Sequence, residues 1–274
     1  MKKARVLFVS QEITPYLAPT AMGTLTRQLA QGIQERGREI RTFMPRYGSI
    51  NERRNQLHEV IRLSGMNLII NDADHPLIIK VASIQSARMQ VYFIDNDDYF
   101  QRKAVLQDKK GNFFDDNDER AIFFSRGVIE TIRKLGWAPD LVHCHGWLAG
   151  LVPVYLKKAF ADDPMFENTK VVYSVYEEEF PESLNKDFCK KAVIDGIGKG
   201  DLDVAKVPNF TNVTKLGIQY ADGIIKASAK LQPEVEKYIL KTGKPVLDYQ
   251  DPENYIDAYN SFYDQVLMEE EVVA

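Results

Sequence analysis

The segment after residue 140 carries the clearest candidates for chemistry. His143 and His145 end an apolar run, and Trp147 follows them. Imidazoles exchange protons near neutral pH and bind metal ions, so this segment is a candidate catalytic or metal-binding site. We expect the two imidazoles to point to opposite sides of the extended segment, one toward the core and the other toward a cleft, so that the pair does not readily bind one metal. The alternative is that both are satisfied side chains of the core.

The turn from Ser10 to Leu25, after the first apolar run, is a second candidate. In nucleotide-binding α/β proteins, glycines here let the backbone approach phosphates at a helix N-terminus. This turn has only Gly23, together with two prolines. Neither of the common glycine-rich phosphate motifs occurs elsewhere in the chain. The two cysteines form no Cys-x-x-Cys pair, and the acidic runs at 95–98 and 115–119 lack the EF-hand pattern, so we expect no metal and no cofactor.

Alternating apolar runs and helical patterns position these residues. Strand-like runs such as 4–10, 140–144 and 171–175 alternate with helical patterns at 22–33 and 117–135, and Asp115 or Asp116 is the expected N-cap of the second. Asp251 and Pro252 mark the start of a last helix over 251–268. The order predicts one α/β domain over 1–274, with a doubly wound, mostly parallel Rossmann-like sheet and helices on both faces. Ligands then bind outside the carboxyl ends of the strands, where both candidate sites lie.

Composition excludes some classes of partner. The net charge of −4 gives no overall attraction to nucleic acid or to an anionic membrane. The longest apolar stretch, "WLAGLVPVYL", is well short of the ~20 residues that span a bilayer. We expect a cytoplasmic protein with reduced thiols.

Several segments together resemble one family. "PRYGSI", "DNDDYFQR", "DDNDERAIFFSRGVIETIRKL", "PDLVHCHGWLAGLVPVYLKK" and "GIQYAD" are similar to the N-terminal domain of bacterial glycogen and plant starch synthases, in the same order. The resemblance implies a glycosyltransferase with two Rossmann-like domains. Such enzymes add glucose from ADP-glucose to the non-reducing end of an α-glucan, with retention of configuration and without a metal. It also implies that this chain carries the acceptor side, that the donor domain is absent, and that the last helix packs back on the first domain.

The resemblance assigns roles to individual residues. Asp116 stands in the family's Asp-Asn-x-x-Arg, and His145 stands at its active-site histidine, so these two are the catalytic candidates if the protein is active. The resemblance implies that the following residues line the cleft and bind substrate: Asn117, Arg120, Trp147, Asp95, Asn96, Tyr99 and Arg102.

The departures from the family lie at the donor site. Ala18 stands at the lysine that would face the donor's diphosphate, and Thr20 and Ala21 replace the two glycines of Lys-x-Gly-Gly-Leu. Further along, the aspartate after the active-site histidine is Gly146, and the family's His-Asn is replaced by Tyr176 and Glu177. The loss of the lysine's positive charge and the Cβ atoms in place of the two glycines predict a degenerate donor site.

Three functional hypotheses follow. The first is a domain that binds α-glucan or maltooligosaccharide, or regulates a partner, without transferring glucose alone. The second is half of a split ADP-glucose-dependent transferase that another chain completes, with ADP-glucose as its donor substrate. The third is a structural or interaction module with an inherited fold. Under all three, the face left by the missing domain favours a protein partner or a homo-oligomer.

Overall fold

A mixed sheet of ten strands forms the centre of the computed structural model, which describes residues 3–180, 182–198 and 200–268. The strands are β1 (Arg5–Ser10), β2 (Glu39–Pro45), β3 (His58–Glu59), β4 (Met66–Ile70), β5 (Ala73–Ile84), β6 (Met89–Asp95), β7 (Leu141–His145), β8 (Lys170–Val175), β9 (Gly223–Lys226) and β10 (Val246–Leu247).

The sheet order is β10-β9-β8-β7-β1-β2-β6-β5-β3, and β4 pairs with β5. Every pair from β10 to β6 is parallel, which confirms the predicted doubly wound, mostly parallel sheet. The flank made by β3, β4 and β5 is antiparallel, which the sequence analysis did not predict. The chain order reverses between β1 and β7, so the carboxyl ends of these two strands form a switch point.

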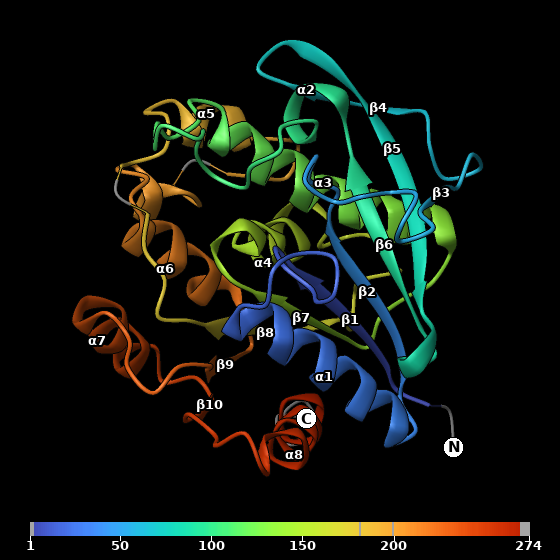
Figure 1. The fold of residues 1–274 in the computed structure, drawn as a ribbon. Helices are drawn as coiled ribbons and strands as arrows, with labels where there is room; N and C mark the ends of the chain where they lie inside the picture. The colour runs from blue at the N-terminus through green and yellow to red at the C-terminus, as the bar shows by residue number, and fades with distance from the viewer. Residues whose placement is uncertain (1–2, 181, 199, 269–274) are drawn as a thin grey trace.

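Helices cover both faces of the sheet (Figure 1). They are α1 (Ala21–Glu35), α2 (Asp97–Phe100), α3 (Asn117–Leu135), α4 (Val152–Val154), α5 (Phe188–Ala192), α6 (Phe210–Tyr220), α7 (Pro233–Thr242) and α8 (Tyr255–Met268). Helix α1 contacts β1, β2 and α8, whereas α3 contacts β2, β6 and α4. Within the described residues, no helix is long and apolar enough to cross a membrane.

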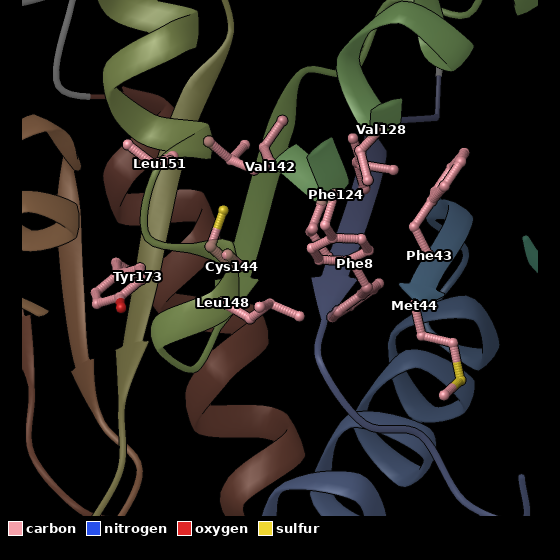
Figure 2. Close-up of a cluster of buried hydrophobic side chains, with 14 of the residues drawn as sticks. Phe8, Phe43, Met44, Phe124, Val128, Val142, Cys144, Leu148, Leu151 and Tyr173 are labelled. Carbon is pink, nitrogen blue, oxygen red and sulfur yellow. The ribbon is translucent and has the colours of Figure 1, made fainter. Parts of the chain in front are cut away.

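The alternation of side chains along β7 divides the core in two. Val142 and Cys144 belong to the apolar cluster that also holds Phe124 and Val128 of α3 (Figure 2). The residues between and after them, His143 and His145, point to the opposite face, because neighbouring residues of a strand alternate. One face of the central strands is therefore apolar and the other carries buried polar groups.

Local signals explain where the two long helices begin and end. Thr20 caps α1, since its hydroxyl oxygen accepts a hydrogen bond from the Gly23 backbone N–H at 2.9 Å. Helix α3 runs from Asn117 to Leu135 as predicted, and Gly136 ends it with a left-handed backbone at φ 62°. Asp116 occupies the N-cap position of α3 but makes no side-chain capping bond.

The last helix begins later than predicted. Asp251 was the expected N-cap, but residues 251–254 form a turn, with the Asn254 backbone N–H donating to the Asp251 carbonyl oxygen at 3.3 Å. Helix α8 starts only at Tyr255, where its side chains first reach the buried face beside α1. Tertiary contacts thus override the local Asp-Pro start signal.

Polar bonds and buried tyrosines hold α8 against the domain. Arg36 pairs with Asp257 at 2.5 Å, and Arg38 pairs with Asp264 at 2.7 Å. Tyr263 is fully buried, and its hydroxyl lies 2.6 Å from Nδ1 of His143. The contact joins residues 120 positions apart, so α8 supplies a partner that β7 cannot find locally.

Replacing Tyr263 with phenylalanine should lower the free energy of unfolding by about 1–3 kcal/mol, because it leaves a buried imidazole nitrogen without its partner. Denaturant unfolding of Tyr263→Phe and of the parent protein measures this difference. Tyr249→Phe is the matched control, since Tyr249 is 39% exposed, and should change stability by less than about 0.5 kcal/mol. Equal stability of Tyr263→Phe and the parent protein would contradict the proposed role of this bond.

Candidate functional site

The switch point between β1 and β7 brings the two sequence-predicted segments together. Ser10, the last residue of β1, pairs in register with His145, the last residue of β7. Behind them the chain continues into the 10–25 turn and into the 146–150 turn. Both candidate segments therefore meet at one edge of the sheet, as the fold class requires.

The two histidines lie on the same face, so the expectation that they point to opposite sides was wrong. Their ring centroids are 3.9 Å apart, because residues two apart in a strand share a face. Both are fully buried, and the described residues contain no group of three or more potential metal-ligating His, Cys, Asp or Glu side chains. His143 bonds Tyr263 through Nδ1 and the Ser174 hydroxyl through Nε2, at 2.7 Å, so both of its nitrogens have partners.

His145, the catalytic candidate of the sequence analysis, is covered by Tyr176. Its Nδ1 is 2.7 Å from the Tyr176 hydroxyl, while its buried Nε2 has no partner among the described residues. Burial lowers the pKa of His145 to about 3, so this imidazole is neutral near pH 7. Tyr176 forms a small buried cluster with Met22 and Ala227 at the same edge. As placed, His145 can offer one nitrogen but cannot carry a charge.

Gly146 and Trp147 follow the histidine in a tight turn. Gly146 has φ 78°, and a Cβ there would lie 2.6 Å from the Met22 side chain. A family-type aspartate therefore does not fit this backbone without movement of Met22. Trp147 is buried, and its ring meets Phe180 edge-on with centroids 5.0 Å apart.

The N-terminus of α1 is occupied by the protein's own carboxylate. The Thr20 hydroxyl donates a short hydrogen bond to Glu12 and accepts one from the Gly23 backbone. A helix N-terminus stabilises a negative group. Glu12 therefore lies where a bound phosphate would otherwise receive the strongest electrostatic stabilisation. Ala18 and Ala21 are exposed beside it and carry no charge.

A second carboxyl group, Glu178, faces the same edge. The Gln11 side-chain amide donates to it at 2.6 Å. Burial, and next the charge of Glu12, raise the pKa of Glu178 to about 8. The adjacent Glu177 is exposed, and its backbone N–H donates to the Ser228 hydroxyl at 2.9 Å. The edge is thus acidic, with one carboxyl that is substantially protonated near neutral pH.

Two hollows lie on either side of Glu12. One, of about 370 Å³, is lined by Phe113, Phe180 and Glu179, and the Phe113 and Phe180 rings stack at 5.6 Å. The other, of about 340 Å³, is lined by Ala18, Thr20 and Lys103. Sequence reasoning missed Lys103, because no motif marks it and only the folded 101–114 loop brings it beside Ala18.

Asp95 and Asn96 are buried at the end of β6. Asp95 pairs with Arg46 at 2.9 Å and with Lys80 at 3.0 Å. The Asn96 side chain accepts from two backbone N–H groups of α2 and donates to the Pro76 carbonyl oxygen at 2.9 Å. The Arg46 guanidinium is thus held by Asp95 at the end of the strand.

The Asp-Asn-x-x-Arg residues hold the loop before α3. Arg120 is buried and donates to the Tyr99 carbonyl oxygen at 2.8 Å and to the Asn117 side chain at 2.7 Å, while Arg102 pairs with Asp116. The Tyr99 hydroxyl donates to Glu119 at 2.9 Å. These residues are brought together around one loop, mainly by bonds to protein groups. Their role toward substrate stays a prediction.

Stability should fall as pH rises through the window set by Glu178. Because the pKa is raised to about 8 in the folded protein and is near 4.5 when unfolded, the folded state holds the extra proton between these values. The group then lowers the free energy of unfolding by up to about 1.4 kcal/mol per pH unit across this window. Denaturant unfolding at pH 5 to 9 measures the slope, and Glu178→Gln should flatten it.

Glu177→Gln is the matched control, since it neutralises the exposed neighbouring carboxylate. It should leave the slope between pH 5 and 8 unchanged. The same slope in Glu178→Gln and the parent protein would show that Glu178 titrates as an ordinary carboxyl group.

Comparison with known proteins agrees with this fold. The catalytic domain of starch synthase IV from Arabidopsis thaliana, bound to ADP and acarbose, superposes with a TM-score of 0.74 at 16% identity, over 91% of this chain and 52% of that one. This likeness concerns the fold alone. The strands and helices that frame the switch point are therefore shared.

Curated relatives agree in sequence. A glycogen synthase from Chlorobium limicola is 39% identical over 173 residues, which cover 63% of this chain and 35% of the relative. One from Chlorobaculum tepidum is 36% identical over 229 residues, 82% of this chain and 46% of the relative. The chain thus spans less than half the length of these relatives. The family model described as the starch synthase catalytic domain matches residues 5–244, and the chain belongs to this family of glycosyltransferase domains.

Proposed function

We propose that this domain binds α-glucan at the carboxyl edge of its sheet and does not transfer glucose from ADP-glucose by itself. The observation that carries the proposal is Glu12, whose carboxylate accepts from the N-cap Thr20 at the start of α1. A diphosphate approaching there would meet the carboxylates of Glu12 and, in the adjoining hollow, of Glu179. Like charges at a phosphate site oppose binding, and the Gly23 backbone N–H at this helix start already donates to Thr20.

The aromatic hollow supports a neutral ligand instead. Phe113 and Phe180 line it, and Trp147 packs behind Phe180. Apolar rings with polar groups at the rim suit the faces of sugar rings, whose binding needs no phosphate. The relatives are glycogen synthases, and the Arabidopsis domain was solved with acarbose as well as ADP, so an α-glucan is the ligand class we infer.

Isothermal calorimetry with maltoheptaose should give saturable binding in the millimolar range. Phe113→Ala should weaken it roughly 3–10-fold, since it removes one aromatic wall of the hollow. Ile61→Ala, a change at an apolar residue that is 80% exposed, is the control and should bind as the parent protein does. No heat of binding at 10 mM ligand, the top of the titration, would overturn the proposal.

Radiolabelled ADP-glucose distinguishes this function from its alternatives. The purified chain should incorporate no glucose into glycogen above background. Incorporation by the chain alone contradicts the proposal, and incorporation only after addition of cell extract favours a split enzyme. If the chain neither binds maltoheptaose nor supports incorporation of glucose, the remaining hypothesis is a structural or interaction module.

A split transferase is the second candidate, and Lys103 is the observation that favours it. Lys103 lines the same hollow as Ala18 and Thr20, so it offers a cation where the family's lysine is missing. On the other side of Thr20, an apolar hollow of about 440 Å³ extends between Leu25 of α1 and Tyr255 of α8. A second chain carrying the donor side would complete the site across this edge.

Binding of ADP, measured by calorimetry, tests the charge balance of this hollow. Lys103→Gln should weaken ADP binding, whereas Glu12→Gln should strengthen it roughly 3–10-fold, because it removes the carboxylate from the α1 N-terminus. Glu35→Gln removes a charge from the exposed C-terminal end of the same helix and should have no such effect. If Glu12→Gln binds ADP no better than Glu35→Gln does, Glu12 is not what opposes phosphate there.

A further inference from the structure

A cavity lies away from the carboxyl edge, at the opposite end of the parallel strands. It has a volume of about 510 Å³ and is lined by the first residues of β2 and β6, by the turn between β5 and β6, and by Gln34 in the last turn of α1. Figure 1 shows this turn close to the C-terminal end of α1. The Gln34 amide donates to the Arg88 carbonyl oxygen at 3.4 Å, so the turn and the helix are tied together.

Arg41 forms one wall of this cavity. Its guanidinium lies over the rings of Trp137 and Tyr92, with centroid distances of 5.2 and 5.5 Å, and donates to the Tyr92 hydroxyl at 2.5 Å. Its buried Nε has no hydrogen-bond partner in the part of the chain that is described. The aromatic rings therefore fix the orientation of a guanidinium whose hydrogen-bonding capacity is mostly unused.

Arg88 stands on the other side. It lies at the end of the short turn Gln85–Ala87 with φ 50°, a left-handed conformation that is uncommon for a residue with a Cβ. Its side chain is exposed at the cavity rim and, among the described residues, has no ion pair. The backbone of the turn thus presents a second unpaired guanidinium to the same space.

The one carboxylate among the lining residues does not neutralise these arginines. Glu39 accepts from the Trp137 indole N–H at 2.5 Å and lies 3.5 Å from the Arg5 guanidinium. The remaining polar lining is neutral and comes from Ser83, Gln85, Gln90 and Gln34. In a chain of net charge −4, the cavity is locally positive.

We propose that this cavity binds the phosphoryl group of a small phosphorylated molecule, held between Arg41 and Arg88. Guanidinium groups match the oxygens of a phosphoryl group with paired hydrogen bonds, more closely than an ammonium group does. The volume exceeds that of a bare anion and falls within the range of small-ligand sites, so a phosphate ester has room for its organic part. Serine and glutamine side chains at the rim supply donors and acceptors for hydroxyl groups of that part.

Amide chemical shifts of the labelled protein test the site at constant ionic strength. The probes are inorganic phosphate, glucose 1-phosphate and uncharged glucose. Both phosphorylated probes should give saturable shifts at Ser83, Gln85, Arg88 and Gln90, and glucose should give none. Tighter binding of glucose 1-phosphate than of inorganic phosphate identifies an ester site, and equal binding identifies a site for free phosphate.

Charge variants complete the test. Arg88→Gln, at an exposed position, should weaken phosphate binding roughly tenfold or more, and Arg41→Lys should weaken it by losing the planar fork. Arg53→Gln is the control, since it removes an exposed arginine elsewhere, and should bind as the parent protein does. The proposal fails if neither phosphorylated probe gives saturable shifts at these amides, if the shifts appear only near Ala18 and Lys103, or if Arg53→Gln weakens binding as much as Arg88→Gln.

Discussion

The burial of polar side chains on one face of β7 and β8 is the constraint that organises this protein. His143, His145 and Ser174 have no exposed surface, so each polar group needs a partner inside the protein. Tyr263 of α8 and Tyr176 after β8 provide the hydroxyl groups. The docking of α8 is therefore part of the core. In its absence the imidazole of His143 would lose a hydrogen bond and the face would lose its cover.

The same constraint shapes the chemistry of the carboxyl edge. Tyr176 bonds His145 and buries it, and burial keeps that imidazole neutral. The positive groups beside Ala18 are the α1 N-terminus and Lys103, and the N-cap Thr20 of that helix donates to Glu12. This charge balance is the basis of the proposal that the edge binds a neutral ligand rather than a diphosphate. Arg41 and Arg88, which have no ion pair among the described residues, lie instead at the opposite end of the sheet.

Local sequence patterns were enough to predict the strands and helices around the site, but not the side-chain contacts within it. Helix α3 was predicted over its observed range because its apolar stripe is a local signal. The start of α8 was missed because packing against α1 outweighs Asp251 and Pro252. The alternation of side chains along a strand should have placed both histidines on one face. Tyr263, the partner of His143, lies 120 residues away in sequence, so no local pattern indicates this contact. Lys103 was missed for the same reason, since a loop brings it to Ala18.

Membership of the starch synthase family and the proposed loss of independent transfer are compatible, because they depend on different residues. The family match covers residues 5–244, most of which form strands, helices and their core. Transfer depends on a few groups where the strands end. The buried bonds of Arg120 and Asn96 hold loops and capped helices in place whatever the ligand is. A fold can therefore keep most of a family's motif residues for structural reasons while replacements such as Ala18 and Tyr176 alter the charge and access that decide which ligand binds.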